Sequence, residues 1–395
     1  MQRKSLIIFY SILLGMMYSH KLHAQLTYVK VDSLSIVYTK NKQWLDLLDL
    51  QKQAKKQDIS YPNLNYRACI AHYYLNKPRK AAFELEKLER INPFAPYIKN
   101  YRLLSYAGIG MQNEAWAVSR KLNADQRKTL GVAKYKGIQS INIDGGIRFY
   151  SDTSLYKPLG MANVSLLTML GRGYASMTNQ YGFVNINAYF GKIYQHQFYT
   201  SFKIPLTHGL NIEPAFHLVS YTVKSIDNTF ETYTDQDFAA SFRLSWNHTF
   251  TELQATQTWL GLYGTNKWQS ELGLKIYPLQ NNKLTLHFRT IISADSTYAN
   301  INPIYLTDIY GLPVKWLETG IWYHHVNHAI FSENNLQILN NSFDLTRYKT
   351  GVYFRFYPGK GFSPMIYYMF ERRRELIQYT PYFTHTLGIS LQYSF

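Results

Sequence analysis

The last eleven residues of the chain, HTLGISLQYSF (385–395), alternate apolar side chains with small or polar ones and stop on an aromatic residue. Leu387, Ile389, Leu391, Tyr393 and Phe395 fall on one face of an extended strand, because successive side chains of a strand point to opposite sides. An apolar face that runs to the final residue is typical of the closing strand of a β-barrel that crosses the outer membrane.

The two aromatic residues at the end of this stretch, Tyr393 and Phe395, form a pattern of their own. An aromatic residue third from the end, followed by a terminal aromatic residue, resembles the C-terminal signal that the outer-membrane barrel-assembly machinery reads. We therefore interpret them as an assembly signal and expect that machinery to be a partner of the chain.

The same alternation fills most of the chain after about Gln139. It is clearest in KLTLHFRTI (283–291), GVYFRFYPG (351–359), SFRLSWNH (241–248) and SELGLKIYP (270–278). In a membrane barrel the apolar face meets lipid and the polar face lines the lumen. A soluble β-sandwich also alternates, but 35 Tyr and 16% aromatic residues are typical of the girdles of a membrane barrel. The mean hydropathy of −0.27 is too polar for a helical membrane protein.

Counting strands by this alternation predicts an antiparallel transmembrane β-barrel of about 14 strands over residues 137–395. Twelve strands is the alternative, because residues 171–180 and 301–313 are ambiguous. Short turns with Pro, Gly or Asn suit the periplasmic end, and they lie within residues 202–212, 275–285 and 356–364. Longer polar segments suit extracellular loops, and they cover residues 223–236, 326–342 and 372–383.

The first 24 residues have the parts of a secretory signal peptide. Arg3 and Lys4 give a positive start, residues 5–19 are apolar but too short to span a bilayer, and Ala24 offers a small residue for cleavage. No cysteine follows this site, which argues against a lipid anchor. The single cysteine, Cys69, excludes an internal disulfide and a cysteine-based metal site.

Residues 25–136 have helical periodicity and predict a separate helical domain. Ala81 and Ala115 mark a repeat of 34 residues, and Pro93 follows the second helix of a pair. This helix–turn–helix period resembles tetratricopeptide repeats, although their usual Trp-Leu-Gly opening is absent. The fold expected for the whole chain is therefore a short tetratricopeptide-like helical domain followed by a membrane β-barrel.

Positive charge is concentrated in the helical domain. Between Gln25 and Lys136, 20 Lys and Arg oppose 9 Asp and Glu, which gives +11 of the +17 carried by the whole chain. Lys52, Lys55 and Lys56 form the densest group and are the candidate partner-binding residues. A periplasmic protein or an anionic polysaccharide would suit this charge, and a solvated surface is the alternative. A periplasmic location makes nucleic acid an unsuitable partner.

Ionisable residues on the polar faces of the predicted strands are the candidate lumen residues. They are Glu213, His217, Arg243, Glu271, Lys275, His287, Arg289 and Arg355. Inward charges either set the selectivity of a pore or pair between strands and close a narrow barrel. We favour pairing, because a barrel of this size has limited space once Tyr and Arg project inward.

Two other clusters contain residue types that can carry chemistry. His324, His325 and His328 do not predict a metal site, since adjacent residues of a strand point to opposite faces. ERRRE (371–375) lies at the predicted extracellular rim and would bind lipopolysaccharide phosphates or remain solvated. The chain has no nucleophile elbow, so we expect neither an enzyme nor a cofactor.

A tetratricopeptide-like N-terminus before a Tyr-rich barrel resembles the YaiO-type outer-membrane proteins and, more loosely, exopolysaccharide export porins. The resemblance implies the outer membrane of a Gram-negative-type bacterium, with the helical domain in the periplasm and lipids and lipopolysaccharide around the barrel. The basic domain beneath the barrel suggests export or assembly of a surface polymer such as a polysaccharide. A narrow diffusion channel and a structural or adhesion barrel are the alternatives.

Overall fold

The computed structural model describes residues 26–93, 96–132, 137–171, 175–188, 191–207, 209–225, 232–295, 302–359, 361–375 and 379–395. The predicted signal peptide lies outside these residues. No helix in the described ranges combines the length and the apolar character needed to cross a bilayer. The chain divides into helices up to Thr129 and strands from Ile138 onward.

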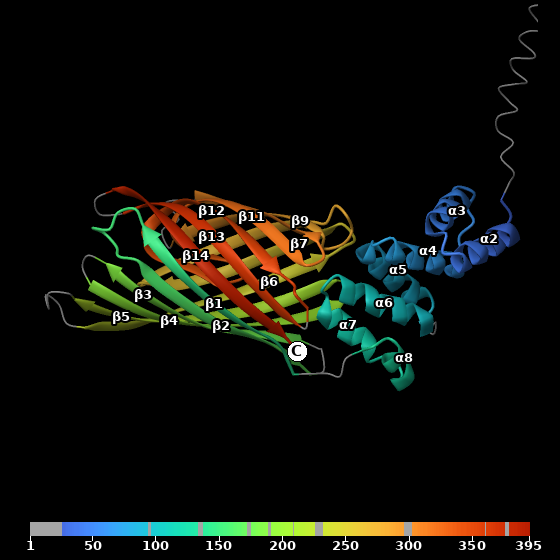
Figure 1. Ribbon diagram of the computed structural model, residues 1–395, viewed down its shortest axis with the longest axis horizontal. Helices are drawn as coiled ribbons and strands as arrows, with labels where there is room; N and C mark the ends of the chain where they lie inside the picture. Colours follow the sequence, from blue (N-terminus) through green and yellow to red (C-terminus); the bar gives the residue numbers. More distant parts are fainter. Residues whose placement is uncertain are drawn as a thin grey trace, which may run out of the picture.

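Seven helices occupy the described part of the N-terminal region (Figure 1). They are α2 (Tyr28–Lys40), α3 (Trp44–Lys56), α4 (Pro62–Tyr74), α5 (Pro78–Ile91), α6 (Pro96–Gly108), α7 (Gln112–Ser119) and α8 (Ala124–Thr129). Pro62 and Pro78 each open a helix, where the missing N–H has no helical acceptor to lose. Asn123 and Gln126 form a capping box at the start of α8.

Helices α2 to α7 stack in sequence order. Each packs on the next, and α4 also contacts both α2 and α6. Ala81 and Ala115, the two alanines of the 34-residue period, are both buried. Small side chains at these positions let neighbouring helices approach closely, which is how stacked helix pairs bury faces that one pair cannot. The assignment to tetratricopeptide repeats stays a prediction.

Fourteen antiparallel strands form a closed barrel, so the prediction of about 14 is confirmed and the alternative of 12 is wrong. The strands are β1 (Ile138–Tyr150), β2 (Leu159–Leu170), β3 (Ala175–Ala188), β4 (Gly191–Thr207), β5 (Leu210–Ser225), β6 (Tyr233–Asn247), β7 (Thr251–Leu262), β8 (Thr265–Ile276), β9 (Leu284–Asp295), β10 (Asn302–Val314), β11 (Leu317–Glu333), β12 (Ile338–Phe356), β13 (Phe362–Arg374) and β14 (Pro381–Ser394). The closing seam between β1 and β14 is paired from Ser140↔Ser394 to Tyr150↔Thr384.

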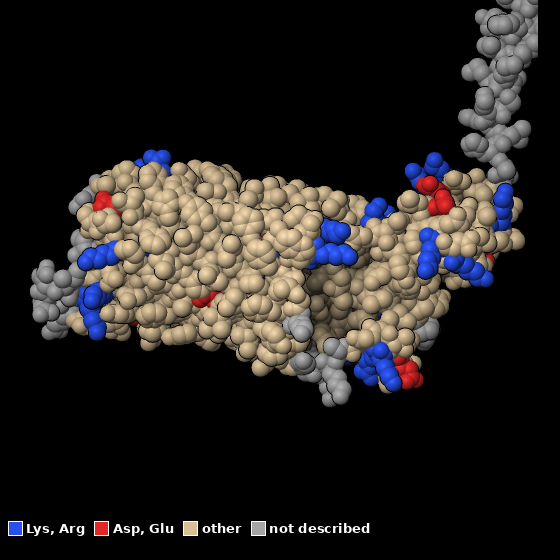
Figure 2. Space-filling view, in the orientation of Figure 1, with Lys and Arg blue, Asp and Glu red and all other residues tan. Residues whose placement is uncertain are grey.

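The barrel wall has an apolar outside and a polar inside. In β6, Phe242, Leu244 and Trp246 point outward and are exposed, while Ser245 and Asn247 point inward and are buried. Figure 2 shows the result on one face, which is almost free of charged side chains between its two ends. Since lipid offers no hydrogen bonds, a closed barrel with this outer band is an outer-membrane-type β-barrel of the Gram-negative kind.

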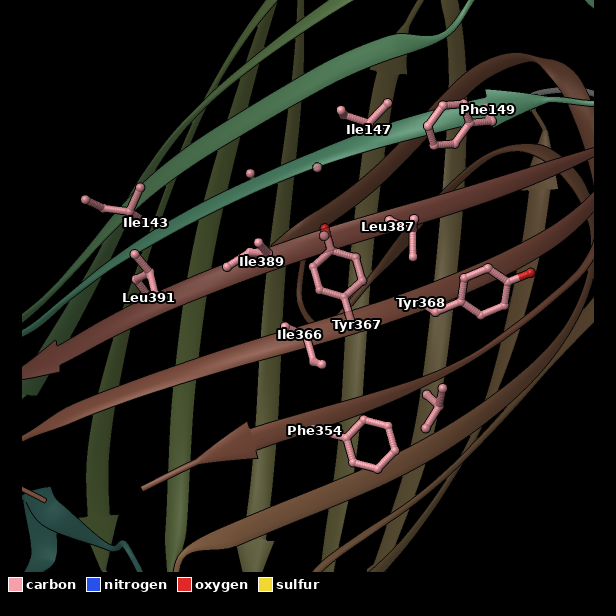
Figure 3. Close-up of a pocket in the computed structure, with 14 residues that line it drawn as sticks. Ile143, Ile147, Phe149, Phe354, Ile366, Tyr367, Tyr368, Leu387, Ile389 and Leu391 are labelled. Atoms are coloured by element: carbon pink, nitrogen blue, oxygen red, sulfur yellow. The ribbon is translucent and has the colours of Figure 1, made fainter. Parts of the chain in front are cut away.

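A shallow apolar groove of about 720 Å³ follows the outer face at the closing seam (Figure 3). Outward Ile143, Ile147 and Ile389 line it, and Gly145 leaves its floor without a side chain. On the inner side of the same strands, the Tyr367 ring covers Gly388, where any Cβ would meet the ring at about 2.1 Å. The glycine is therefore required for close packing at the seam.

The helical domain is fixed to the end of the barrel that carries the short turns (Figure 1). Arg79 is fully buried there and donates to the carbonyl oxygen of His248 at 2.8 Å. Its guanidinium also lies 3.6 Å from the centre of the Tyr277 ring. Asn282 donates to the carbonyl oxygen of Ile109 at 2.7 Å, on a neighbouring part of the interface. The three predicted turns share this end of the barrel with the C-terminus, because β4, β8 and β12 all end there.

Candidate functional site

The barrel lumen is crossed by a hairpin of the chain itself, which we call the inward hairpin and define as residues 326–343. It consists of the end of β11, the turn after Glu333 and the start of β12. The pairing of β11 with β12 shifts register on both sides of His328, and Asn327 has a φ of 58°. Bulges of this kind bend a strand away from its neighbours, so the hairpin leaves the wall here.

This finding corrects the prediction that residues 326–342 form an extracellular loop. The segment contains many polar residues, but its apolar members Phe331 and Leu336 are fully buried. Those side chains turn the segment into the barrel because the interior offers an apolar surface to receive them.

The tip of the inward hairpin is hydrogen-bonded to β5 and β6 on the far side of the barrel and to β9 on the near side. His217 of β5 donates from Nδ1 to the carbonyl oxygen of Leu336 at 2.7 Å. Ser241 of β6 donates to the Asn335 side chain at 2.6 Å, and Arg289 of β9 donates to Asn334 at 2.7 Å. Strands β5 and β6 lie far from β11 and β12 in the closed strand order. The hairpin therefore spans the lumen.

The tip has an unusual backbone. Asn334, Asn335 and Leu336 have φ values of 52°, 57° and 68°. Asparagine tolerates this left-handed region, whereas leucine rarely adopts it. The conformation is held because Leu336 buries its side chain completely while its carbonyl receives the His217 bond.

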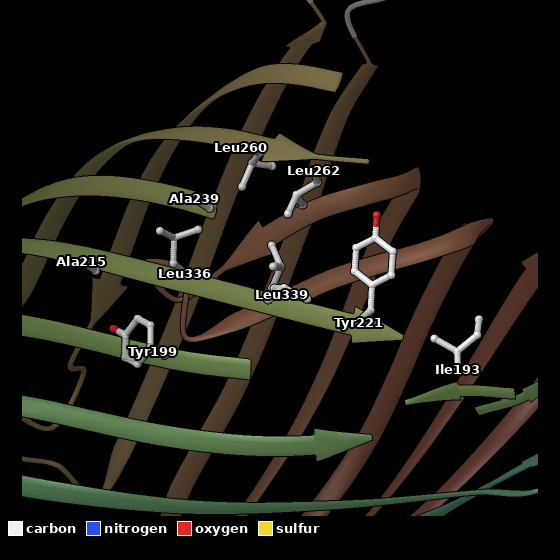
Figure 4. Packing of buried hydrophobic residues seen from close by; sticks show 10 residues of the cluster. Ile193, Tyr199, Ala215, Tyr221, Ala239, Leu260, Leu262, Leu336 and Leu339 are labelled. Atoms are coloured by element: carbon white, nitrogen blue, oxygen red, sulfur yellow. The ribbon is translucent and has the colours of Figure 1, made fainter. Parts of the chain in front are cut away.

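The part of the barrel wall that contacts the tip is apolar. This differs from the sequence-based prediction that the inward faces of the strands are polar. Leu336 and Leu339 pack with a cluster from β4 to β7 that faces inward (Figure 4). The cluster comprises Ile193, Tyr199, Ala215, Val219, Tyr221, Ala239, Leu260 and Leu262. The small side chains of Ala215 and Ala239 leave space on the inner face of the barrel, and the leucines of the hairpin pack into that space.

The base of the hairpin is held on the opposite, charged side of the lumen. Asp308 of β10 accepts from Arg289 at 2.9 Å and lies 2.8 Å from His324 Nε2. Glu333, at the end of β11, is paired with Lys349 and lies 3.3 Å from His324 Nδ1. These contacts join β9, β10, β11 and β12 in one network of charged side chains. Loss of any partner would leave a buried charge unpaired, which is strongly destabilising.

A second charged cluster lies on the adjoining strands. Glu371 of β13 is paired with Arg148 of β1 at 3.4 Å and with Arg373 at 3.0 Å. The Thr384 hydroxyl donates to the same carboxylate at 2.8 Å. Of the predicted rim segment ERRRE, Glu371 and Arg373 therefore point inward, whereas Arg372 is exposed. Arg374 lies on the same outward face as Arg372, so the predicted contact with lipopolysaccharide is left to these two residues and stays a prediction.

Side chains that can carry the opposite charge lie next to four of the eight residues predicted for the lumen, Arg243, Glu271, Lys275 and His287. Arg243 and Glu271 are paired at 3.2 Å, and Lys275 is paired with Glu252 at 3.3 Å. His287 lies 3.4 Å from Asp308.

The other four predicted lumen residues differ in their contacts. His217 and Arg289 hold the hairpin tip. Glu213 offers its backbone oxygen to Asn335 at 3.1 Å, and Arg355 Nη2 lies 3.5 Å from the sulfur of Met365. Whether any of the predicted residues sets selectivity stays a prediction.

Sequence reasoning missed several residues of the charged side. Asp308 lies in the segment that was ambiguous between strand and loop, and Glu333 lies in the segment predicted to be a loop. The sequence places His324 in a cluster with His325 and His328 that does not predict a metal site, and the pattern gives it no other role. Among the residues that the structure describes, no group of three or more metal-ligating side chains is arranged to hold an ion. The signal that could have located His324 is the alternation within β11, in which Ile321 and Tyr323 face outward and are exposed, so that His324 faces inward.

The predicted residues outside the lumen are at the surface. Lys52, Lys55 and Lys56 are exposed on α3. Tyr393 and Phe395 point outward at the end of β14, with ring centres 5.0 Å apart. The backbone N–H of Phe395 donates to Gln139 at 3.0 Å, which ties the last residue to the start of the barrel. Their roles as partner site and assembly signal stay predictions.

No family model matches the chain, and neither does any curated protein sequence. Solved structures match about two thirds to three quarters of the chain. A deletion mutant of the monoaromatic hydrocarbon channel TodX is 11% identical over 68% of this chain and 92% of its own, with a TM-score of 0.45. The monoaromatic hydrocarbon channel CymD is 9% identical over 73% and 97%, with a TM-score of 0.44. A Pseudomonas aeruginosa FadL homologue is 10% identical over 65% and 90%, with a TM-score of 0.38.

Proposed function

We propose that this protein is a narrow outer-membrane channel whose lumen is constricted by its own inward hairpin. The observation that carries the proposal is the set of hydrogen bonds that Asn334, Asn335 and Leu336 accept from strands β9, β6 and β5. A hairpin attached at both its base and its tip divides the lumen, so only small solutes pass unless the hairpin moves.

The experiment is conductance of the purified protein in planar lipid bilayers. The inward hairpin is shortened by replacing residues 330–342 with Gly-Ser-Gly, and single-channel conductance is compared with that of the unchanged protein. We expect a severalfold increase, because the shortened chain no longer crosses the lumen. Ser270→Ala is the control, since Ser270 is exposed on the outer face of β8.

Two results would overturn this proposal. One is a large, steady conductance in the unchanged protein, which would mean that the hairpin does not constrict the lumen. The other is an unchanged conductance after shortening, in protein that still migrates as a folded barrel in unheated gels.

A second candidate function is export or assembly of a surface polymer, with the helical domain as its recruiting platform. It is favoured by the position of that domain on the short-turn end of the barrel, fixed through Arg79. This role accords with the resemblance to YaiO-type proteins and with a periplasmic location for the domain. The exposed Lys52, Lys55 and Lys56 would then contact an anionic polysaccharide or a periplasmic protein.

The platform role is tested by binding of the full-length protein to anionic glycan, lipopolysaccharide and periplasmic extract at increasing salt. Binding should weaken as salt rises, because exposed charges are screened beyond roughly 8 Å at physiological ionic strength. Reversal of all three lysines to Glu should weaken it further. Equal binding by the triple variant, or no binding at low salt, would leave the basic surface as solvation only.

A further inference from the structure

A separate cavity of about 160 Å³ lies inside the barrel, between the inward hairpin and strands β1 to β5. Tyr150, the last residue of β1, and Leu159, the first of β2, both line it. The cavity therefore lies at the end of the barrel remote from the helical domain. Leu339 of the hairpin forms part of its wall, next to Tyr221 (Figure 4).

Aromatic rings form two sides of this cavity. On one side, Tyr150, Tyr156 and Tyr382 are grouped with ring centres 5.0 to 6.1 Å apart. On the other side, Tyr221 and Tyr263 have ring centres 5.3 Å apart. Ring faces carry partial negative charge and attract polarised C–H groups, so the cavity presents surfaces suited to a flat, partly apolar face of a ligand.

The cavity also contains a polar group without a protein partner. Gln195 of β4 is only 4% exposed and lines the cavity, and its amide Nε2 has no hydrogen-bond acceptor. A buried amide donor left unsatisfied is destabilising by about 1–3 kcal/mol. A ligand with an oxygen acceptor at this position would satisfy it.

The charges that line the cavity are already compensated. Arg148 and Arg373 both bind Glu371, at 3.4 and 3.0 Å. Asp344 accepts a hydrogen bond from Tyr382. A charged ligand would have to displace one of these pairs, so the electrostatics favour a neutral one.

We infer that this cavity is a binding site for a small neutral polyhydroxyl compound, of the size of a single sugar unit. Such molecules combine C–H faces, which suit the tyrosine rings, with hydroxyl groups, which suit the Gln195 amide. A hydrocarbon of the same size would fill the space but would leave the Gln195 amide in a dry cavity without an acceptor. The cavity is smaller than sites for drug-sized ligands, which limits the occupant to one ring.

This inference names a substrate class for the proposed channel and so rests on that function. The site lies immediately beside the hairpin, because Leu339 belongs both to the cavity wall and to the apolar cluster that holds the tip. A solute bound here would stand at the constriction, on the side remote from the helical domain.

The test is calorimetric titration of the full-length protein in detergent with three probes: methyl glucoside, glucuronate and toluene. We expect methyl glucoside to bind at least tenfold more tightly than either of the others. Gln195→Leu should weaken methyl glucoside binding about tenfold, the value of one hydrogen bond. Gln254→Leu is the matched control, since Gln254 is equally buried on the inner face of β7 but does not line the cavity.

Tyr156→Leu is the second variant, because Tyr156 lines the cavity from the connection between β1 and β2, outside the strands themselves. Tyr156→Leu should also weaken methyl glucoside binding. It therefore provides the test of the site if Gln195→Leu does not fold. Absence of binding by methyl glucoside, equal or tighter binding of toluene or glucuronate, or unchanged binding in both folded variants would overturn the inference. Calorimetry measures occupancy without transport, so a failed titration leaves the conductance result standing, and the reverse also holds.

Discussion

The helical domain and the barrel place the same types of residue in opposite positions. Leu47 and Leu85 are fully buried between helices, whereas Leu272 is 69% exposed on the barrel. Lys52 lies at the surface of α3, whereas Lys349 is buried inside the barrel. A barrel in lipid keeps its polar groups inside, and a helical stack in water keeps them outside. Whether a side chain is buried therefore depends on whether lipid or water surrounds that part of the molecule, and residue type alone does not decide it.

The difference also changes what an ion pair contributes. In the helical domain, Lys87 and Glu84 are 3.0 Å apart and both exposed, so the pair contributes well under about 1 kcal/mol. In the barrel, Glu333 and Glu371 are almost completely enclosed, and each depends on its cations. Charge changes should therefore be tolerated at exposed helical positions such as Lys87 and should be destabilising in the lumen.

The largest expected effect is on assembly of the barrel. Phe395→Asp should abolish or strongly reduce the heat-modifiable protein in the outer membrane, because it places a charge on the lipid face and removes the terminal aromatic residue. The measurement is the folded fraction in unheated gels of membrane preparations. Normal levels of folded protein would show that Phe395 is not an assembly signal, and Phe395→Tyr serves as the conservative control.

The second effect is on the charged side of the lumen. Lys349→Leu removes the ammonium group beside Glu333 and should lower the free energy of unfolding by about 3–5 kcal/mol. Urea unfolding in lipid vesicles measures it. Adding Glu333→Gln should recover part of the loss, since the buried carboxylate is then absent. A single variant as stable as the unchanged protein would mean that the pair is solvated.

The boundary between the two regions gives an intermediate effect. Arg79→Leu removes three hydrogen bonds and the contact with Tyr277, and should weaken docking of the helical domain by about 2–4 kcal/mol. Hydrogen exchange of the turns around His248 and Gln280 should then increase while the strands stay protected. Arg79→Lys should recover little, because lysine lacks the planar fork. Unchanged exchange in Arg79→Leu would show that other contacts hold the domain.

The sequence contained enough information to predict the barrel, because its strands repeat a two-residue pattern that ends in a clear last strand. The inward hairpin was not predictable in the same way. Its bulge at Asn327 interrupts the alternation, and its Asn334-Asn335 turn has the composition of an ordinary loop. Its destination depends on Ala215 and Ala239, which are distant in sequence and become a receiving surface only when the barrel closes. Contacts across a lumen join residues far apart in the chain and therefore produce no regular pattern in the sequence.

The smallest effect concerns His72, a buried histidine of the helical domain. The histidines of the lumen, His287 and His324, differ from it because they lie beside the carboxylate of Asp308. Burial lowers the pKa of His72 to about 4, and the nearby Lys80 and Lys77 add to the shift. The folded state therefore holds His72 neutral, while the unfolded chain titrates near 6.5. Stability from this group is fully present above pH 6.5 and is lost as the pH falls toward 4, at about 1 kcal/mol per pH unit or less.

Hydrogen exchange of the α4 and α5 amides, corrected for intrinsic rates, measures this loss between pH 7 and pH 5. His72→Leu should flatten the dependence, because leucine keeps the buried volume and has no proton to bind. His248, in the β6–β7 turn, provides the comparison, since His248→Leu should leave the slope of α4 and α5 unchanged. An equally steep slope in His72→Leu would assign the acid sensitivity to other groups, with the carboxylate of Asp32 next to be tested, because its hydrogen bond from Arg67 lowers its pKa. A lowered carboxylate pKa also makes stability fall with acid, but in the lower range below about pH 4, so the pH at which protection is lost separates the two residues.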